Sequence, residues 1–364
     1  MFKKIIKISS DPFSNKRDLN FLRYPAFLIL WILNKFFYIM FKILKVKILT
    51  APLEAIGHQI FDLECFFYEK KRKGFNFKPI VLSHGKFIAN QYLLNYQKKM
   101  YDFYEVNNKF LCLILFYQKK YFSNVTFDTN SYVATRKAAK CYQILKKNDL
   151  SIKLEKADNL KAEQILKNKK LKINKKLVIL HVRDNSFKPF DGETYRSSKI
   201  KNFGLSIDYL LSRGYQIIRI GNQGMNRNPY NSKIIDLSKY KFDEDLQLLQ
   251  LYLVSKCSFF IGTCSGPYKF ATIMKKPILT VDMAPMSITF PVARRAIAIP
   301  KLYRNKKTKK IISFRDVFYF NFSNLRLDKE FVSHNIELLE NSPTEILSGV
   351  KELEKIYKNR NFST

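Results

Sequence analysis

The chain has 364 residues, of which 46% are apolar and 26% are charged. This length suggests two domains of ordinary size, and the composition excludes a chain that is disordered throughout. The formal net charge of +35 favours polyanionic partners such as phosphates, nucleic acid or anionic lipid headgroups. Part of this charge reflects a general bias towards Lys, Asn, Ile, Phe and Tyr, so charge alone does not choose among these partners.

The five cysteines are odd in number, irregularly spaced and without a C-x-x-C pair. They therefore indicate neither a disulfide framework nor a zinc site, and a reducing, cytosolic compartment fits best. The first 23 residues are polar and basic and precede the first apolar run, so no cleavable signal peptide is predicted. The cysteines are Cys65, Cys112, Cys141, Cys257 and Cys264.

Residues 1–45 form a basic and apolar segment that we expect to associate with a membrane. Its apolar run, YPAFLILWILNKFFYIMF at 24–41, is just long enough to span the hydrocarbon core as a helix. Lys42, Lys45 and Lys47 follow at once and leave little linker before the folded part. Three alternatives stay open: a helix in the membrane interface, a transmembrane anchor and an ordinary core helix.

The pattern becomes α/β from Val46 onward, and residues 46–165 are predicted as a first α/β domain on the acceptor side. Strands are expected at VKILT and PIVLS, and the loop APLEAIGH leads into a helix, QIFDLECFFYEKK. The apolar run FLCLILF at 110–116 fits either a strand or a helix. A polar helix and a basic linker between 149 and 176 mark the domain boundary.

The second domain, predicted over 175–364, shows the clearest alternation of strands and helices, which indicates a parallel, doubly wound sheet. The predicted fold class is thus α/β, with two doubly wound Rossmann-like domains facing each other and a hydrophobic helix at the N-terminus. The predicted strands of this domain are 177–182, 215–221, 233–238, 258–263 and 277–282, and its helices are 203–214, 242–257 and 265–276.

Polar residues follow these strands where ligands bind in open α/β sheets, at the carboxyl ends. Arg183 and Arg219 would supply charge-assisted contacts. Thr263, Ser265 and Gly266 are expected at a helix start, where backbone N–H groups favour phosphate. The alternative is that the two hydroxyls only cap the helix. The other strand-end candidates are His181, Asp184, Gly221, Asn222 and Asp236.

Several segments, in this order, resemble a family of bacterial glycosyltransferases with a GT-B-like C-terminal domain. This family is linked to surface polysaccharide synthesis and is distantly similar to heptosyltransferases. The resemblance covers residues 46 to about 290. It is carried by AIGH at 55–58, HVRDNSF…YRSSKIKNF with GYQIIRIG, IIDLSKYKFDEDLQLLQLYLVSKCSFFIGTCSG, and KKPILTVDMAP.

The resemblance implies a site for a nucleotide-sugar donor in the C-terminal domain. His58, from the first domain, would face the acceptor and act as general base on its hydroxyl, because a histidine suits proton transfer near neutrality. The alternative is a structural turn residue beside Gly57. The implied donor residues are Arg183, Arg196, Arg219, Thr263, Ser265 and Gly266 around the diphosphate, and Gly221, Asn222 and Asp236 towards the nucleoside or sugar.

The run Asp243-Glu244-Asp245 allows two interpretations. It matches the D-x-D that holds a divalent cation in GT-A glycosyltransferases, but it also opens a predicted helix, where acids cap free N–H groups and stabilise the helix dipole. We favour capping and expect neither a metal nor another cofactor. No P-loop motif is present, which argues against a P-loop kinase.

We therefore expect a metal-independent glycosyltransferase that moves a sugar from a nucleotide-sugar to a lipid-linked or surface polysaccharide acceptor. Its place would be cytoplasmic, peripheral to or anchored at the inner face of the cytoplasmic membrane. The alternative is a non-catalytic nucleotide-sugar-binding or membrane assembly protein. A nucleic-acid-binding protein is disfavoured, because the aromatic residues lie mostly within apolar runs rather than between lysines.

Overall fold

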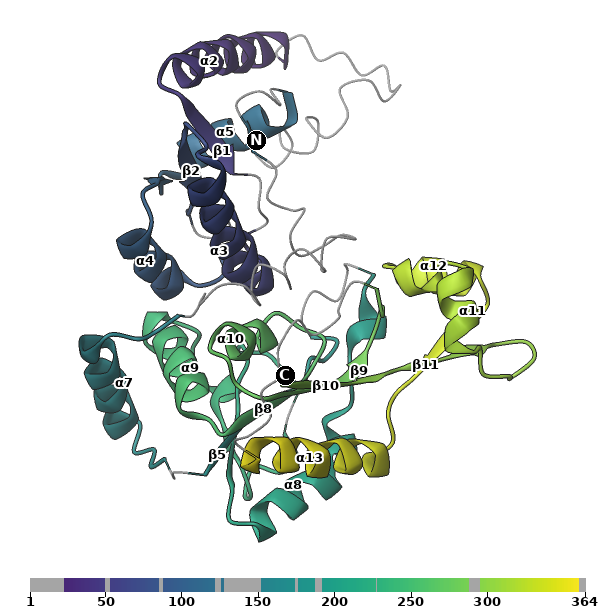
Figure 1. The fold of residues 1–364 in the computed structure, drawn as a ribbon. Helices are drawn as coiled ribbons and strands as arrows, with labels where there is room; N and C mark the ends of the chain where they lie inside the picture. The colour runs from purple at the N-terminus through teal and green to yellow at the C-terminus, as the bar shows by residue number, and fades with distance from the viewer. Residues whose placement is uncertain are drawn as a thin grey trace.

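The structure is a computed structural model that describes residues 23–49, 53–84, 88–121, 126–127, 152–173, 176–186, 192–226, 228–287 and 295–359. Within these residues two α/β parts lie one above the other, with the N-terminal part at the top of Figure 1. The fold class is thus confirmed as α/β with parallel sheets. Residues 1–22 of the expected membrane segment, and Cys141, lie outside the described residues.

The N-terminal part contains a parallel sheet, which has four strands within the described residues, in the order β3-β2-β1-β4. The apolar run at 110–116 is helical, which decides between the two alternatives left open by the sequence. The strands are β1 (Val46–Leu49), β2 (Lys78–Leu82), β3 (Tyr104–Val106) and β4 (Thr126–Phe127), and the helices are α3 (Ile56–Lys73), α4 (Gln91–Met100) and α5 (Lys109–Tyr121).

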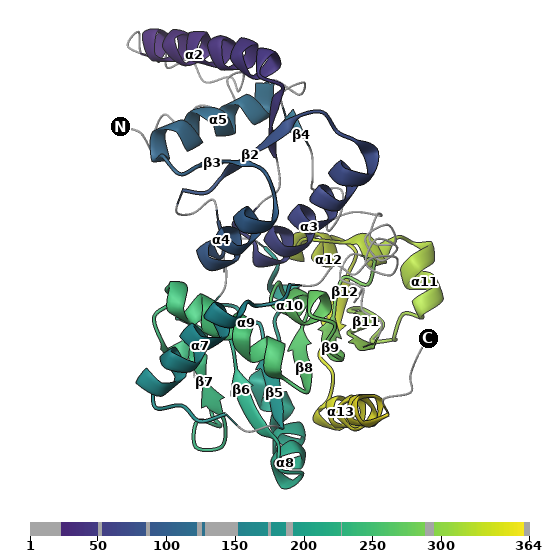
Figure 2. The same ribbon diagram turned by 60° about the vertical axis from the view of Figure 1, so that its left-hand side comes forward.

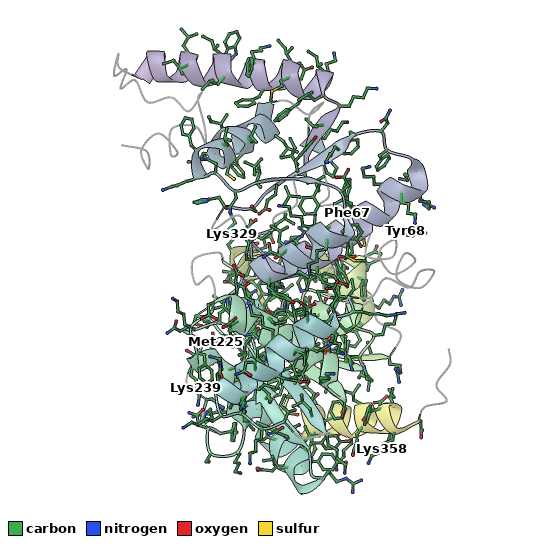
Figure 3. The ribbon with its side chains drawn as sticks, turned by 90° about the vertical axis from the view of Figure 1, so that its left-hand side faces the viewer. Phe67, Tyr68, Met225, Lys239, Lys329 and Lys358 are labelled. Carbon is green, nitrogen blue, oxygen red and sulfur yellow. The ribbon has the colours of Figure 1, made fainter. Side chains whose placement is uncertain are left out.

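Helix α2 (Arg23–Ile43) covers the outer end of this part (Figure 2). Phe41 is buried, and Phe37, Tyr38 and Met40 pack against the same core cluster with β1, β2 and α5. No helix among the described residues is long and apolar enough to cross a membrane. Side chains of α2, the purple helix at the top of Figure 3, also project away from the sheet.

The C-terminal part is built on a second parallel sheet, six-stranded within the described residues, in the order β10-β9-β8-β5-β6-β7. Successive side chains of β5 point to opposite faces, as in any strand. Leu177 and Ile179 pack with α9 and α10, whereas Val178 and Leu180 pack with α8 and α13. The strands are β5 (Leu177–His181), β6 (Gln216–Arg219), β7 (Ile235–Asp236), β8 (Phe259–Thr263), β9 (Ile278–Met283) and β10 (Ala296–Pro300).

Helices cover both faces of this sheet, which makes it doubly wound. They are α7 (Lys156–Asn168), α8 (Gly204–Ser212), α9 (Glu244–Lys256), α10 (Tyr268–Ile273) and α13 (Pro343–Lys358), with the short 3₁₀ helices η3 (Thr194–Arg196), η4 (Ile200–Phe203) and η5 (Leu237–Lys239). A small antiparallel sheet, which the sequence did not predict, carries two further helices beside it. It consists of β11 (Leu302–Asn305) and β12 (Ile336–Leu339), with α11 (Phe314–Tyr319), η6 (Phe322–Asn324) and α12 (Asp328–Ser333).

The two parts meet where α3 and α4 lie against α10 and α9 (Figures 1 and 2). A single apolar core cluster runs through this contact and includes Phe61 and Leu93 on one side and Leu246 and Phe270 on the other. The Gln247 side chain on α9 accepts hydrogen bonds from the first two backbone N–H groups of α4, at 2.9 and 3.2 Å. The contact is therefore both apolar and directional.

Helix α7 touches both parts. Its Glu163 accepts a hydrogen bond from Tyr252 on α9 at 3.1 Å, while Asp158 contacts the Tyr92 hydroxyl on α4. The division into domains at 46–165 and 175–364 stays a prediction, and α7 is the element that lies across it.

The acidic run at 243–245 opens α9, and Asp243 is its N-cap residue. Its carboxylate accepts a hydrogen bond from the Leu246 N–H at 3.0 Å. This is the capping role that the sequence favoured. Among the residues that the structure describes, no three His, Cys, Asp or Glu side chains come together as metal ligands would.

Replacing Asp243 by Ala should lower the free energy of unfolding by about 1 kcal/mol, because the Leu246 N–H loses its acceptor. Urea unfolding measures the change. Glu244→Ala, an exposed acid in the same turn, is the matched control and should cost less than half as much. Equal losses in the two variants would mean that only the helix dipole is involved and that Asp243 does not cap.

Candidate active site

The strand order of the six-stranded sheet reverses between the parallel neighbours β5 and β8. After β5 the chain adds β6 and β7 on one side of the sheet, and after β8 it adds β9 and β10 on the other side. Ligands bind at such a switch point, outside the carboxyl ends of the strands. Here the two strand ends are tied together, because the Arg183 N–H donates to the Thr263 hydroxyl at 2.9 Å. A cavity of about 560 Å³ opens over this point, between the two parts of the molecule.

Six of the donor- and acceptor-site residues implied by the family resemblance line this cleft, although they come from distant parts of the chain. The N-terminal part contributes the start of α3, and the C-terminal part contributes the loops after β5, β6 and β8. A volume of this size is ordinary for a small-molecule site. The six residues are His58, Arg183, Arg196, Asn222, Ser265 and Gly266.

Two guanidinium groups in the cleft share one carboxylate. Glu193 lies 2.7 Å from Arg196 Nη1 and 3.7 Å from Arg183 Nη2. Arg196 also donates to the Cys264 carbonyl at 3.0 Å and so holds the turn that follows β8. The group has more positive than negative charge and lies in a largely buried place, where charge-assisted contacts to an anion are strong.

The other four implied site residues, Arg219, Gly221, Asp236 and Thr263, are not part of the cleft lining. Arg219 is buried, 2.9 Å from Asp236 and 3.8 Å from Asp184. Thr263 is fully buried in its bond to the Arg183 N–H. The Gly221 carbonyl accepts from Gln250 at 2.8 Å. These residues hold the strand ends in place.

A second, larger cavity of about 1020 Å³ lies within the C-terminal part. It shares Asp184 and Tyr195 with the cleft. Its lining also includes Arg219, residues of η3, η4 and β12, and Asn226, Asn228, Pro229, Asn231 and Ser232. Of these two cavities, the cleft is the better candidate site, because its described lining comes from both parts, whereas that of the larger cavity comes from the C-terminal part.

The sequence predicted that the turn Thr263-Cys264-Ser265-Gly266 opens a helix directly. This prediction is wrong, because the helix starts two residues after the turn. Helix α10 has only six residues and begins at Tyr268, with Pro267 at its N-cap position. The expected dipole of a long helix is therefore missing at Ser265. Of this turn, Ser265 and Gly266 line the cleft, whereas Thr263 and Cys264 are fully buried.

Gly266 and Gly57 lie in close backbone contact between the two parts. A Cβ atom on Gly266 would lie 2.2 Å from Ile56 Cγ2 and 2.9 Å from the Gly57 nitrogen, distances that no side chain tolerates. A Cβ on Gly57 would lie 3.3 Å from the Gly266 Cα. The AIGH and TCSG segments therefore touch, and only glycine allows it.

His58 lies in the first turn of α3 rather than in the predicted loop, because the helix starts at Ile56. Its Nδ1 is 2.8 Å from the Asp62 carboxylate, one helical turn further on. The Asp62 side chain is fully buried, whereas that of His58 is about one-fifth exposed. A carboxylate on Nδ1 fixes the imidazole and leaves Nε2 as the nitrogen that can exchange a proton. Asp62 was missed from the sequence, although its i+4 spacing was visible.

Lys269 on α10 is a second residue that the sequence did not single out. It lines the cleft, and its ammonium group lies 4.3 Å from the Phe61 ring centroid and 4.4 Å from that of Tyr268. Phe61 belongs to α3, so this cation–π contact joins the two parts beside the glycine contact.

His181 lies at the end of β5 beside the cleft, and its Nδ1 is 3.1 Å from the Ile220 carbonyl. Burial lowers the pKa of His181 to about 4, and the nearby Arg219 and Arg183 contribute to this. The imidazole is thus neutral at pH 7 and adds no charge to the cleft.

No family model and no curated protein matches the chain. Solved structures match most of it. A glycosyl transferase of family 9 from Veillonella parvula is 14% identical over 85% of this chain and 96% of that chain, with a TM-score of 0.49. The E. coli ADP-heptose lipopolysaccharide heptosyltransferase II is 11% identical over 86% and 99%, with a TM-score of 0.48.

A third match is the E. coli heptosyltransferase WaaC with ADP-2-deoxy-2-fluoro heptose, 12% identical over 77% of this chain and 99% of that chain, with a TM-score of 0.36. These structures are heptosyltransferases and relatives, as the sequence resemblance indicated.

Replacing Gly266 by Ala should lower the free energy of unfolding by about 1–3 kcal/mol, as overpacking does in a tight contact. Gly57→Ala is the matched control and should cost much less, because its nearest contact is longer and alanine favours the helix. Urea unfolding gives the cost, and small-angle scattering should show a larger radius of gyration for Gly266→Ala. If Gly266→Ala unfolds and scatters as the wild type does, the two glycines do not touch in solution.

Proposed function

We propose that this protein is a GT-B-type glycosyltransferase that moves a sugar from a nucleotide-sugar donor to a hydroxyl of a lipid-linked or surface polysaccharide acceptor. One observation carries this function. Arg183, Arg196 and the Thr263–Gly266 turn converge at the switch point of a doubly wound sheet, and His58 lies across the same cleft on the other part of the molecule.

The donor diphosphate would lie over the switch point. Arg183 and Arg196 neutralise its charge, and the Ser265 hydroxyl and the backbone N–H groups of the turn bind its oxygens. When the bond between the anomeric carbon and the diphosphate oxygen breaks, the same groups stabilise the nucleoside diphosphate that leaves. Guanidinium groups then take the place that a divalent cation has in metal-dependent glycosyltransferases, so we expect metal-independent transfer.

His58 would act on the acceptor side. Its Nε2 removes the proton from the acceptor hydroxyl while the hydroxyl oxygen forms its bond to the anomeric carbon. The Asp62 carboxylate, 2.8 Å from Nδ1, holds the ring in place and stabilises the imidazolium that forms. This is the arrangement in which a carboxylate orients a histidine base.

The exposed face of α2 would attach the protein to the anionic lipids at the inner face of the cytoplasmic membrane. Large apolar side chains are exposed from Leu28 to Ile43 of the helix and at Leu44, which follows it, and lysines flank its C-terminal end. This is the pattern of a helix that lies in the membrane interface. The exposed side chains are Leu28, Ile29, Trp31, Ile32, Phe36, Ile39, Ile43 and Leu44.

Donor binding and transfer can be tested separately. Arg183→Ala should weaken the binding of a nucleoside diphosphate about ten- to a hundredfold, the effect of losing one charge-assisted contact. His58→Ala should bind it within about twofold of wild type but lose transfer. Calorimetry with ADP, UDP, GDP and CDP in turn measures affinity, and release of nucleoside diphosphate from the matching nucleotide-sugar measures turnover.

Asp243 caps α9 and has no proposed role in donor binding or transfer, so Asp243→Asn is the control for both measurements. This variant should behave as the wild type does, with and without EDTA. The function is wrong if no nucleoside diphosphate binds. The site is wrong if Arg183→Ala binds normally while Asp243→Asn does not, which would favour a metal-dependent site at 243–245.

The membrane role of α2 is tested by replacing Ile32, Phe36 and Ile39 with Ser, which leaves the buried face of the helix intact. This variant should lose most of its sedimentation with phosphatidylglycerol vesicles, because apolar contact area is removed. Leu160→Ser, an exposed apolar position on α7, is the control and should sediment as the wild type does. Equal sedimentation of all three proteins would exclude α2 as the attachment site.

A further inference from the structure

We propose that the C-terminal part carries a second lipid-binding surface, independent of the transferase function. It consists of residues 304–320: the lysine-rich hairpin after β11 and helix α11, which follows it. We name this segment the aromatic-basic patch. In Figures 1 and 2 it lies at the outer edge of the C-terminal part, projecting beyond the six-stranded sheet.

The patch exposes large apolar side chains at high density. Five of them within ten residues are between 47% and 79% exposed. Helix α11 is held by the fully buried Val317, which belongs to the core cluster of Tyr303 and Phe331. The helix therefore has a buried anchor and an otherwise exposed aromatic surface, and exposed apolar patches of this kind mark interaction sites. The exposed side chains are Ile311, Phe314, Phe318, Tyr319 and Phe320.

The aromatic side chains are surrounded by positive charge. The patch contains six Lys and Arg residues but only one acid, Asp316. That acid is engaged within its own helix turn, where its carboxylate accepts from the Ser313 hydroxyl at 2.8 Å. Arg304 and Lys309 pair with Glu337 on β12. Lys306, Lys307, Lys310 and Arg315 are exposed at the surface.

An anionic lipid surface matches this chemistry best. Aromatic side chains with an apolar body prefer the level of the lipid headgroups, and each nearby Lys or Arg adds attraction to anionic lipid. Helix α11 has only six residues, too few to present a long helical stripe to a protein partner. Neighbouring rings also meet edge to face, as Tyr319 and Phe320 do at a centroid distance of 5.0 Å. Stacking of successive nucleic acid bases would instead need open ring faces.

The consequence concerns how the molecule sits on a membrane. Helix α2 belongs to the N-terminal part and the patch belongs to the C-terminal part, and the two lie apart from each other in Figure 1. Two lipid contacts, one on each part, would attach the molecule to lipid at two points. Binding through both would be stronger than through either alone, because the second contact forms within an already bound molecule.

A fluorescent reporter tests the patch directly. Trp31 is the only tryptophan, so Trp31→Phe provides a background in which Phe318→Trp reports on the patch alone. Adding vesicles of phosphatidylglycerol and phosphatidylcholine should shift the emission of this tryptophan to shorter wavelength. Leu160→Trp in the same background, an exposed position on α7, should not shift. Vesicles of phosphatidylcholine alone should give a much smaller change at position 318.

A second arm tests the charges without touching the aromatic side chains. Lys307→Glu with Lys310→Glu should weaken binding to the anionic vesicles about tenfold or more. Lys156→Glu with Lys167→Glu, an exposed pair on α7, is the matched control and should change it little. Equal weakening by both pairs would mean that only the net charge matters, which overturns the patch.

Three outcomes of the reporter experiment also overturn the inference. The protein could sediment with vesicles while the tryptophan at position 318 stays unchanged, which would leave α2 as the contact. The emission could shift with protein concentration in the absence of lipid, which would mean that a second copy covers the patch. It could shift with single-stranded RNA and not with vesicles, which would assign the patch to nucleic acid.

Discussion

The architecture of the candidate site depends on one contact, the approach of Gly57 to Gly266. It joins the first turn of α3 to the turn after β8, and no side chain larger than hydrogen fits at Gly266. The same contact sets His58, the next residue along α3, at a fixed distance from the switch point of the second sheet. The apolar core that continues through α3, α9 and α10 stabilises this arrangement.

Charge in the second sheet is divided into two layers with different tasks. Arg219 is buried between Asp184 and Asp236 and holds the ends of β5, β6 and β7 together. Such a pair costs desolvation energy and mainly specifies geometry. Arg183 and Arg196 line the cleft, where they share the Glu193 carboxylate. The buried layer keeps the loops that carry the upper layer in position.

The sequence predicted the regular part of the second domain well, because buried parallel strands are continuous apolar runs. It failed where a local signal was overlooked or where only the tertiary fold decides. The Gly266-Pro267 pair is typical of a turn and predicts a later start for α10. The spacing of four residues between His58 and Asp62 predicts that the two side chains lie on one face of a helix. Lys269 could not be predicted, because its partner Phe61 belongs to another part of the chain. The strands beyond residue 295 have only four or five residues each, which is too short for a clear pattern.

The central claim is that a nucleoside diphosphate binds in the cleft between the two parts, over the switch point. A crystal structure of the protein grown with the nucleoside diphosphate that binds most tightly tests it most directly. We expect both phosphates within hydrogen-bonding distance of Arg183, Arg196 and the N–H groups of residues 264–266, with His58 facing the open side. A diphosphate bound instead in the larger cavity beside Arg219, with the cleft empty, would contradict the account.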